Sequence, residues 1–571
     1  MKKLIILLLI IFTSFNLFSK DQEILPLESK AYDYIDYLYL LNSKVPPTAA
    51  KPYSISQMKV YLNSLNYNNL NKTSIKYYNY LTKLIEKESL DIKLDDLSSI
   101  DVEGNTGFEV YTHNNTTDIK TNRDWTYLQE DRIPLLKLKL NIALDKIFFT
   151  TCELQYQQGK YEPSKDSIYY LKNNDFIDNY APYGIGTLAS TDIIYNILTN
   201  QYNQKYSTNI PLASKFIDFD TPKRAFLSVG GKNWNLNFSK DTIEWGNSII
   251  GNFIFDNHFN NNFLNLKFYS KKFNINNTIA FLNTQTNNGE SPDTEIKMFM
   301  THRLEFRPFE KFRFAISENV MYQNNIPIFL YFNPSNIYHN INMREMFNAI
   351  AHFESDIYIS KNKSWYSQFV LDQARAPNEN ASQSAAWGFS TGLRKTSIIN
   401  KNILILTTEA LIATPCLYRR DEVDFISFNR TFVINQSYVI EPTFIGFQEG
   451  GDSLAFKIQV QYNNLDKFNF LIYYYLLFKG EVDIFTATHV DENGNPISND
   501  DKPNYGEMLF KNGIYSLKHV IYSALDYQIY SDKNISISNK ITFSYIYKLR
   551  LKPSASSYDD IQLSSGISIK F

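Results

Sequence analysis

The chain has no long hydrophobic run after its first residues, so the remainder of the sequence predicts no membrane-spanning helix. Cysteine is also scarce, with only Cys152 and Cys416 in 571 residues. Two cysteines so far apart indicate neither a disulfide framework nor a zinc site. Positive charge is not in excess, because 57 lysines and arginines stand against 59 aspartates and glutamates. Nucleic acid is therefore not an expected partner.

The sequence also lacks the motifs of common catalytic sites. Its seven histidines include no pair at zinc-binding spacing. Neither Gly-x-Ser-x-Gly nor the phosphate-binding Gly-x-x-x-x-Gly-Lys occurs. We therefore expect no catalytic residue, no metal and no cofactor, although missing motifs only lower the case for an enzyme.

Aromatic residues, in contrast, are abundant, with 41 tyrosines and 42 phenylalanines, while the mean hydropathy is only −0.32. Apolar residues alternate with polar ones along much of the chain. A transmembrane β-barrel has this composition because only every second residue meets lipid, while the others face a polar interior. A soluble exported protein can have similar averages, so the pattern along the chain has to distinguish the two.

The N-terminus has the pattern of a secretory signal peptide over residues 1–19. Met1, Lys2 and Lys3 precede an apolar run over residues 4–12, and small and polar residues follow up to Ser19. The apolar run is shorter than the ~20 residues that a spanning helix needs. We therefore expect removal of this segment and export of the mature chain.

Residues 20–100 show helical periodicity. Their apolar residues predict one helix over Ala31–Leu41, a second one N-capped by Ser54 after a proline-rich turn, and a third one N-capped by Thr73. We interpret residues 20–100 as a small helical periplasmic segment or plug.

From residue 101 to residue 571 the period changes to two. Leu136–Leu144 alternates strictly, turns at Asp145 and Lys146, and returns through Phe148–Tyr156, which predicts a β-hairpin with one apolar face. About 18 such segments have the ~10-residue length that a tilted membrane strand needs. The predicted fold is an all-β transmembrane barrel of about 18 antiparallel strands, in contact with outer-membrane lipid. Long polar connections over residues 159–222, 323–348 and 480–513 are typical of outward-facing loops.

The last segment, Ile561–Phe571, carries apolar residues at nearly every odd position and ends in an aromatic residue. It resembles the C-terminal signal of outer-membrane proteins, which the barrel-insertion machinery recognises. Together with the signal peptide, it predicts location in the cell outer membrane. The main alternative is a secreted, soluble β-sandwich array.

A polar set of side chains is predicted on the inner face of the barrel. Met298, Met300, Leu304 and Phe306 share one face of a strand, which leaves the charged residues between them on the other. The predicted lumenal charged belt consists of Arg303, Glu305, Arg307, Asp372 and, if a bulge shifts the register, Glu318. The belt could bind or steer a polar ligand. It could equally be a salt-bridge network that holds the strands, because interior charges must be paired.

One predicted outer loop is crowded with aromatic and amide residues, and flat rings beside hydrogen-bonding groups suit sugars. The candidate ligand-binding residues there are Tyr331, Asn333, Tyr338, His339 and Asn340. Tyrosine and asparagine are common throughout the chain, so composition alone could explain part of this pattern.

Several stretches resemble the Wzi-type capsule-assembly proteins, a family of outer-membrane barrels that hold capsular polysaccharide at the cell surface. The resemblance lies in Asp241–Gly246 with Asn257, His302–Pro308 with Ile316–Glu318, and Asn333–Pro334 with Tyr338–Asn340, continuing to Gln368–Asp372. The N-terminal helices resemble those that precede the barrel in spirochaete-like members. One departure is the glycine-rich stretch of the family, which is reduced here to Asn247–Gly251 and puts that loop's geometry in doubt.

The resemblance implies a barrel of about 18 strands without catalytic activity, which attaches surface polysaccharide in a lectin-like manner. Our first hypothesis is therefore a non-enzymatic outer-membrane protein that anchors or helps assemble surface (capsular) polysaccharide. The alternative is a porin-like channel whose charged belt selects small polar solutes. A weaker third possibility is an enzyme of the lipid-modifying barrel class.

Overall fold

The computed structural model describes most of the chain. The described residues are 20–86, 92–93, 98–119, 122–159, 202–211, 217–218, 222–282, 296–324, 333, 335–338, 346–373, 385–419, 423–433, 437–465, 467–484, 508–510, 513–532, 535–551 and 556–571. The predicted signal peptide and large parts of the three predicted long connections lie outside the described residues.

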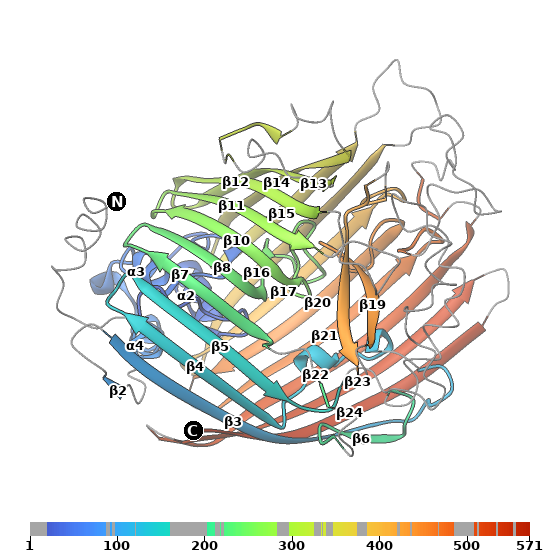
Figure 1. Cartoon of the computed structure of the whole chain (residues 1–571), viewed down its shortest axis with the longest axis horizontal. Helices are drawn as coiled ribbons and strands as arrows, with labels where there is room; N and C mark the ends of the chain where they lie inside the picture. The colour runs from blue at the N-terminus through green and yellow to red at the C-terminus, as the bar shows by residue number, and fades with distance from the viewer. Residues whose placement is uncertain are drawn as a thin grey trace.

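Eighteen long antiparallel strands form a closed barrel (Figure 1), as the period of two predicted. They are β3 (Ser98–His113), β4 (Leu136–Leu144), β5 (Phe148–Tyr156), β7 (Arg224–Gly230), β8 (Trp234–Thr242), β10 (Asn260–Tyr269), β11 (Phe273–Leu282), β12 (Ile296–Phe309), β13 (Phe312–Asn324), β14 (Met346–Ser360), β15 (Lys363–Gln373), β16 (Ala386–Ile399), β17 (Asn402–Ala413), β20 (Ser453–Asn464), β21 (Phe468–Lys479), β22 (Tyr515–Ser531), β23 (Ser536–Leu551) and β24 (Ser556–Lys570). The short strands β2 (Ile92–Lys93) and β6 (Tyr206–Thr208) add to the wall.

The two faces of the wall differ as the alternation predicts. On β24, Ile561 and Leu563 point outward and are 40% and 42% exposed, whereas Gln562 and Ser564 point inward and are 2% and 4% exposed. Side chains alternate in this way because successive Cβ atoms of a strand point to opposite faces of the sheet. The outer wall is therefore apolar, and the inner wall carries most of the buried polar side chains.

The last strand closes the barrel against the first. β24 pairs with β3, and the backbone groups of Phe571 and Gly104 exchange two hydrogen bonds of 2.9 Å. A Cβ atom on Gly104 would lie 2.3 Å from the Phe571 ring, so only glycine admits the ring at this place. The predicted terminal strand is thus the one that completes the ring.

Three helices occupy one end of the barrel, at the left of Figure 1, namely α2 (Lys30–Leu41), α3 (Ile55–Leu62) and α4 (Lys72–Ile85). None of the described helices is long and apolar enough to span a membrane. Ser54 caps α3 as predicted, because its hydroxyl accepts a hydrogen bond of 3.1 Å from the Gln57 amide. The Thr73 prediction is wrong. The cap of α4 is Asn71, whose side chain accepts from the Ser74 amide at 2.9 Å.

This helical segment contacts the short turns of the wall. The Val45 amide donates to the carbonyl of Glu310 in the β12–β13 turn, Ser56 Oγ donates to that of Gly231 in the β7–β8 turn, and Gln22 Nε2 donates to that of Lys146 in the β4–β5 turn, at 3.0, 3.0 and 3.1 Å. The helices also share a buried core with the inward-facing Ile403 and Ile405 of β17. The helical segment therefore lies against the inside of the barrel at its short-turn end.

A second body of chain fills the interior further along. It consists of the β8–β10 connection with β9 (Glu244–Trp245), residues 414–419, and the two-stranded hairpin of β18 (Ile426–Val433) and β19 (Ser437–Phe444) with the residues that follow it. Phe253 and Phe255 of the connection share one buried core with inward-facing wall residues such as Phe299 of β12. The rings of Phe255 and Phe299 lie 5.1 Å apart, edge to face. Much of the interior is thus a packed hydrophobic core.

Candidate functional site

Arg303 and Glu305 of the predicted lumenal charged belt form a cluster with three further buried charged residues, Arg313, Glu354 and Asp356. Arg303 of β12 contacts Glu305 Oε2 at 2.6 Å and Glu354 Oε2 of β14 at 2.8 Å. Arg313 of β13 donates from Nε to Asp356 Oδ2 at 3.0 Å and lies 3.4 Å from Glu305 Oε2. Arg303, Arg313 and Glu305 are at most 3% exposed. Each guanidinium therefore meets two carboxylates in a site that excludes water.

The helical segment and the β8–β10 connection, which we together call the plug, both contact this cluster. Thr48, just before the short strand β1 (Ala50–Lys51), donates from Oγ1 to Glu305 Oε2 at 2.9 Å. Arg307 donates to the carbonyl of Pro46, and Asn247 of the β8–β10 connection donates to Asp356 Oδ1 at 2.7 Å. The belt side chains are therefore bonded to one another and to the plug, which supports the structural interpretation of the belt over a solute-binding one.

The structure corrects the predicted belt at Glu318. In the β12–β13 register Glu318 lies opposite His302, and both point to the outer face. The bulge in this pair lies between Phe306 and Phe309, beyond the position where it could turn Glu318 inward. Asp372 does lie inside, but away from the arginines, where its Oδ2 accepts a hydrogen bond of 2.9 Å from the Tyr418 amide.

Sequence reasoning missed the carboxylates Glu354 and Asp356, which pair with the belt arginines. A usable signal was present, because Phe353 and Ile357 alternate with them on β14 and are exposed on the outer face. The alternation places Glu354 and Asp356 inside, but it does not say which strand's charges they meet.

The candidate sugar-binding loop is described only in part. Tyr331, His339 and Asn340 lie outside the described residues. Asn333 is exposed, and its Oδ1 accepts from the Ser335 amide at 3.0 Å. Asn333 remains a predicted binding residue.

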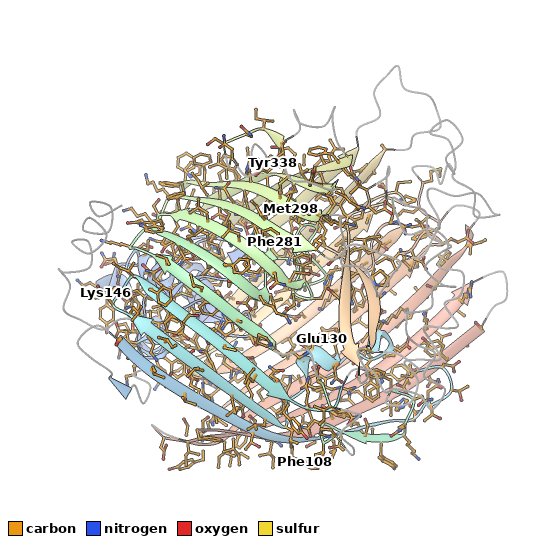
Figure 2. All side chains as sticks on the ribbon, viewed as in Figure 1. Phe108, Glu130, Lys146, Phe281, Met298 and Tyr338 are labelled. Atoms are coloured by element: carbon orange, nitrogen blue, oxygen red, sulfur yellow. The ribbon has the colours of Figure 1, made fainter. Side chains whose placement is uncertain are left out.

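Tyr338 lies on the outer side of the wall, near Met298 (Figure 2). Its ring stacks on His302 with 4.0 Å between centroids, and its amide donates to Glu318 Oε2 at 3.0 Å. Burial raises the pKa of the Tyr338 hydroxyl above its ordinary value. His302 therefore covers one face of the Tyr338 ring, and Tyr338 packs against the outer side of the wall.

The β8–β10 connection enters the interior through a sharp bend after Trp245. Gly246 has φ +127°, and a Cβ atom there would lie 2.0 Å from Asn252 Oδ1, so the bend requires glycine. Glu409 of β17 then holds the connection, because its Oε2 accepts from the Ile249 amide at 2.6 Å. The reduced glycine content of residues 247–251 is thus compatible with an inward fold of this stretch.

Partly buried charges also join the helical segment to the β8–β10 connection and to the wall. Lys51 Nζ lies 3.4 Å from Glu244 Oε2, and Asp36 Oδ2 lies 4.0 Å from Arg394 of β16. Burial raises the pKa of Asp36 to about 6, because desolvation disfavours the charged carboxylate. Protonation of Asp36 therefore makes its burial in the plug less costly.

No family model matches the chain, and no curated protein matches it. Among solved structures, Escherichia coli Wzi, described as a carbohydrate-binding β-barrel involved in group 1 capsule assembly, has a TM-score of 0.55 at 9% identity, covering 95% of this chain and 98% of that one. OprD of Pseudomonas aeruginosa has a TM-score of 0.36 at 8% identity, covering 82% and 94%. The channel DcaP of Acinetobacter baumannii has a TM-score of 0.30 at 8% identity, covering 84% and 99%.

The closed ring of eighteen strands, with its apolar outer wall, makes this chain an outer-membrane β-barrel, as predicted. Of the three similar structures, only Wzi exceeds a TM-score of 0.5. At 9% identity the similarity to Wzi concerns the fold alone.

Proposed function

We propose that this protein is a non-enzymatic outer-membrane barrel that anchors or helps assemble surface polysaccharide in a lectin-like manner. The observation that carries the proposal is the interior, which is filled by the chain's own helices and by the β8–β10 connection. A barrel whose inside is a packed core offers its rim and outer mouth to large polymers more readily than a path to small solutes.

Hydrogen bonds to buried carboxylates hold the plug inside the barrel. Glu305 accepts from Thr48, Asp356 accepts from Asn247, and Glu409 accepts from the Ile249 amide, all with buried carboxylates. Removing such a partner would leave a buried charge short of a hydrogen bond, which costs ~1–3 kcal/mol or more. A plug held by several of these bonds stays in place under ordinary conditions.

The resemblance of the short motifs to Wzi-type proteins supports the same proposal. The fold similarity to Wzi, a protein described as carbohydrate-binding, is in line with it. Among the described residues, no group of three or more His, Cys, Asp or Glu side chains is placed to hold a metal ion.

A porin-like channel is the second candidate. It is favoured by the inner wall of β21 and β22, where Tyr473, Tyr475 and Lys518 face inward and are only half-buried. This side of the interior is less tightly packed than the side of β12–β14.

Planar-bilayer conductance and glycan retention separate the two candidates. We expect the intact protein to open no steady pores and to be retained on surface polysaccharide from its own cells. A known open porin, measured in the same bilayers, serves as the control that an open barrel can be detected. Steady conductance by the intact protein, without retention on the polysaccharide, would sink the anchoring proposal.

We also propose that the barrel-insertion machinery recognises the terminal strand through Phe571. Deletion of Phe571 removes the ring that packs on Gly104 and the last two backbone bonds of the β3–β24 seam. We expect the deleted protein to be depleted from the outer-membrane fraction. Normal membrane levels of the deleted protein would contradict this role.

A further inference from the structure

Three basic side chains line the inner wall near the long-connection end of the barrel. Lys518 of β22 and Lys548 of β23 lie directly opposite each other, and Arg550 lies one inward position nearer the end of β23. Their parity matches that of the buried inward residues Val520 and Ile546 on the same strands. Arg550 is exposed, and both lysines are half-buried. We call these three residues the basic mouth.

The basic mouth is not neutralised within the described part of the chain. Lys518, Lys548 and Arg550 make no ion pair with any described residue. Asp124 and Glu449 act on Lys548 only at longer range. On the neighbouring strand β21, by contrast, Lys479 donates to the carbonyl of Val482 at 2.7 Å.

Two like charges directly opposite each other on neighbouring strands destabilise a sheet. An anionic group placed between them would remove the repulsion. The pair therefore has the electrostatics of an anion-binding site.

Aromatic rings continue the inner wall away from the mouth. Tyr473 of β21 and Tyr522 of β22 stack with 4.9 Å between centroids and 21° between planes, and Tyr475 lies between them and the mouth on β21. Lys548 Nζ lies 5.9 Å from the ring of Tyr558 on β24. Tyr522 is buried, and Tyr473 already meets both Tyr522 and the Lys457 ammonium, which lies 4.2 Å from its ring centroid. The half-buried Tyr475 and Tyr558 lie nearer the mouth, and each combines an apolar ring with a hydroxyl, which suits sugar rings.

We propose that the basic mouth binds the carboxylate groups of an acidic polysaccharide, and that Tyr475 and Tyr558 beside it contact its sugar rings. This inference rests on the proposed function and names its substrate class. Cations on two successive inward positions lie ~7 Å apart along the strand. A polymer with repeated carboxylates can neutralise several of them together, whereas a single small anion meets only one or two.

The direction of these side chains separates a polymer from lipid. Lys518, Lys548 and Arg550 share the inner face of the wall, while Ile521 on the outer face of β22 is 42% exposed. Lipid headgroups surround the outer face of a membrane barrel, and a polymer enters through the mouth.

Binding of two labelled probes to the purified full-length barrel tests the inference, with polygalacturonate as the acidic glycan and dextran as the neutral one. We compare the intact protein with the triple variant Lys518→Gln, Lys548→Gln, Arg550→Gln. The matched control, Lys232→Gln, Lys271→Gln, Lys272→Gln, removes three exposed charges at short turns of the opposite end.

We expect polygalacturonate to bind the intact protein and the control equally, and the triple variant at least tenfold more weakly. The binding should also weaken as salt is raised, because screening acts on exposed charges. Equal polygalacturonate binding by all three proteins would overturn the inference. Binding of dextran alone would overturn it and leave the proposed function standing, while no retention of either probe together with pore conductance would overturn both.

A second measurement keeps the test valid if the triple variant folds poorly. Polygalacturonate should raise the unfolding midpoint of the intact protein and raise that of Lys548→Gln less. An equal rise in both proteins would contradict a role for the basic mouth.

Discussion

Two parts of the inner wall carry charges with the same period of two and use them differently. On β12–β14, Arg303 and Arg313 are fully buried and each meets two carboxylates. On β22 and β23, Lys518 and Lys548 face each other half-exposed and without a described carboxylate partner. The first set holds the plug in place, and the second set lies where a ligand can reach it.

The comparison shows that an inward charge has no fixed meaning in a barrel. A buried ion pair contributes mainly by avoiding the cost of an unpaired charge, because desolvation offsets much of the attraction. A half-exposed charge remains hydrated and available. The degree of burial therefore separates the structural cluster of β12–β14 from the accessible charges of β22 and β23.

The largest expected effect comes from Arg303→Met. It leaves Glu305 and Glu354 buried without their main partner, so we expect a loss of ~3–5 kcal/mol in unfolding free energy. Denaturant unfolding in detergent micelles measures this. Arg550→Met is the control, and as an exposed substitution it should change stability by only ~0.5 kcal/mol. Equal losses in the two variants would erase the distinction between the two parts of the wall.

The next effect is pH-dependent and concerns Asp36. Its pKa is raised to about 6 in the folded protein, so the folded state binds the proton more tightly than the unfolded state between about pH 4 and pH 6. The contribution of Asp36 to stability is therefore present below pH 4 and lost as pH rises through 6, by up to about 3 kcal/mol.

Asp36→Asn should remove this part of the pH dependence while leaving the rest of the profile. Unfolding midpoints of both proteins at pH 4.5 and pH 7 provide the measurement. Parallel profiles for the variant and the natural protein would show that Asp36 does not titrate in this range.

A smaller effect is expected from Thr48→Val, which removes the plug's hydrogen bond to Glu305. Bonds to charged groups contribute ~1.5–3 kcal/mol, so the helical segment should open more often. Hydrogen exchange of residues 30–85 reports this opening. Thr116→Val, in an exposed loop, is the matched control and should leave that exchange unchanged. Unaltered protection in Thr48→Val would mean that this bond does not hold the plug.

The smallest effect has the opposite sign. Lys548→Gln removes the repulsion with Lys518, so the ligand-free protein should become more stable by ~0.2–1 kcal/mol. Thermal unfolding without added glycan measures the change, and Lys271→Gln is the control. A destabilised Lys548→Gln would mean that Lys548 has a structural partner.

Sequence reasoning was most successful on the wall. The strict alternation of Leu136–Leu144 and Ile561–Phe571 has a purely local cause, because strand geometry alone assigns each side chain to a face. The same rule placed Arg303, Glu305, Arg307 and Asp372 inside. Glu318 went wrong because it depended on a bulge, and the position of a bulge follows from the pairing of two strands.

The site was less predictable for the same reason. Glu354 and Asp356 come from a strand whose contact with Arg303 and Arg313 depends on register across three strands. Tyr338 has the composition of a sugar-binding residue, yet its ring lies against His302. Neither contact can be read from one segment of the chain.

The sequence by itself determined the barrel, its approximate strand number, its apolar outer wall and the helical character of residues 30–85, because these depend on periodicity within short segments. Only the tertiary structure decided that the helices and the β8–β10 connection fill the interior. It also separated the paired arginines from the lysines that have no carboxylate partner among the described residues. Pairing of charges depends on distances between segments far apart in sequence, and those distances exist only once the barrel has closed.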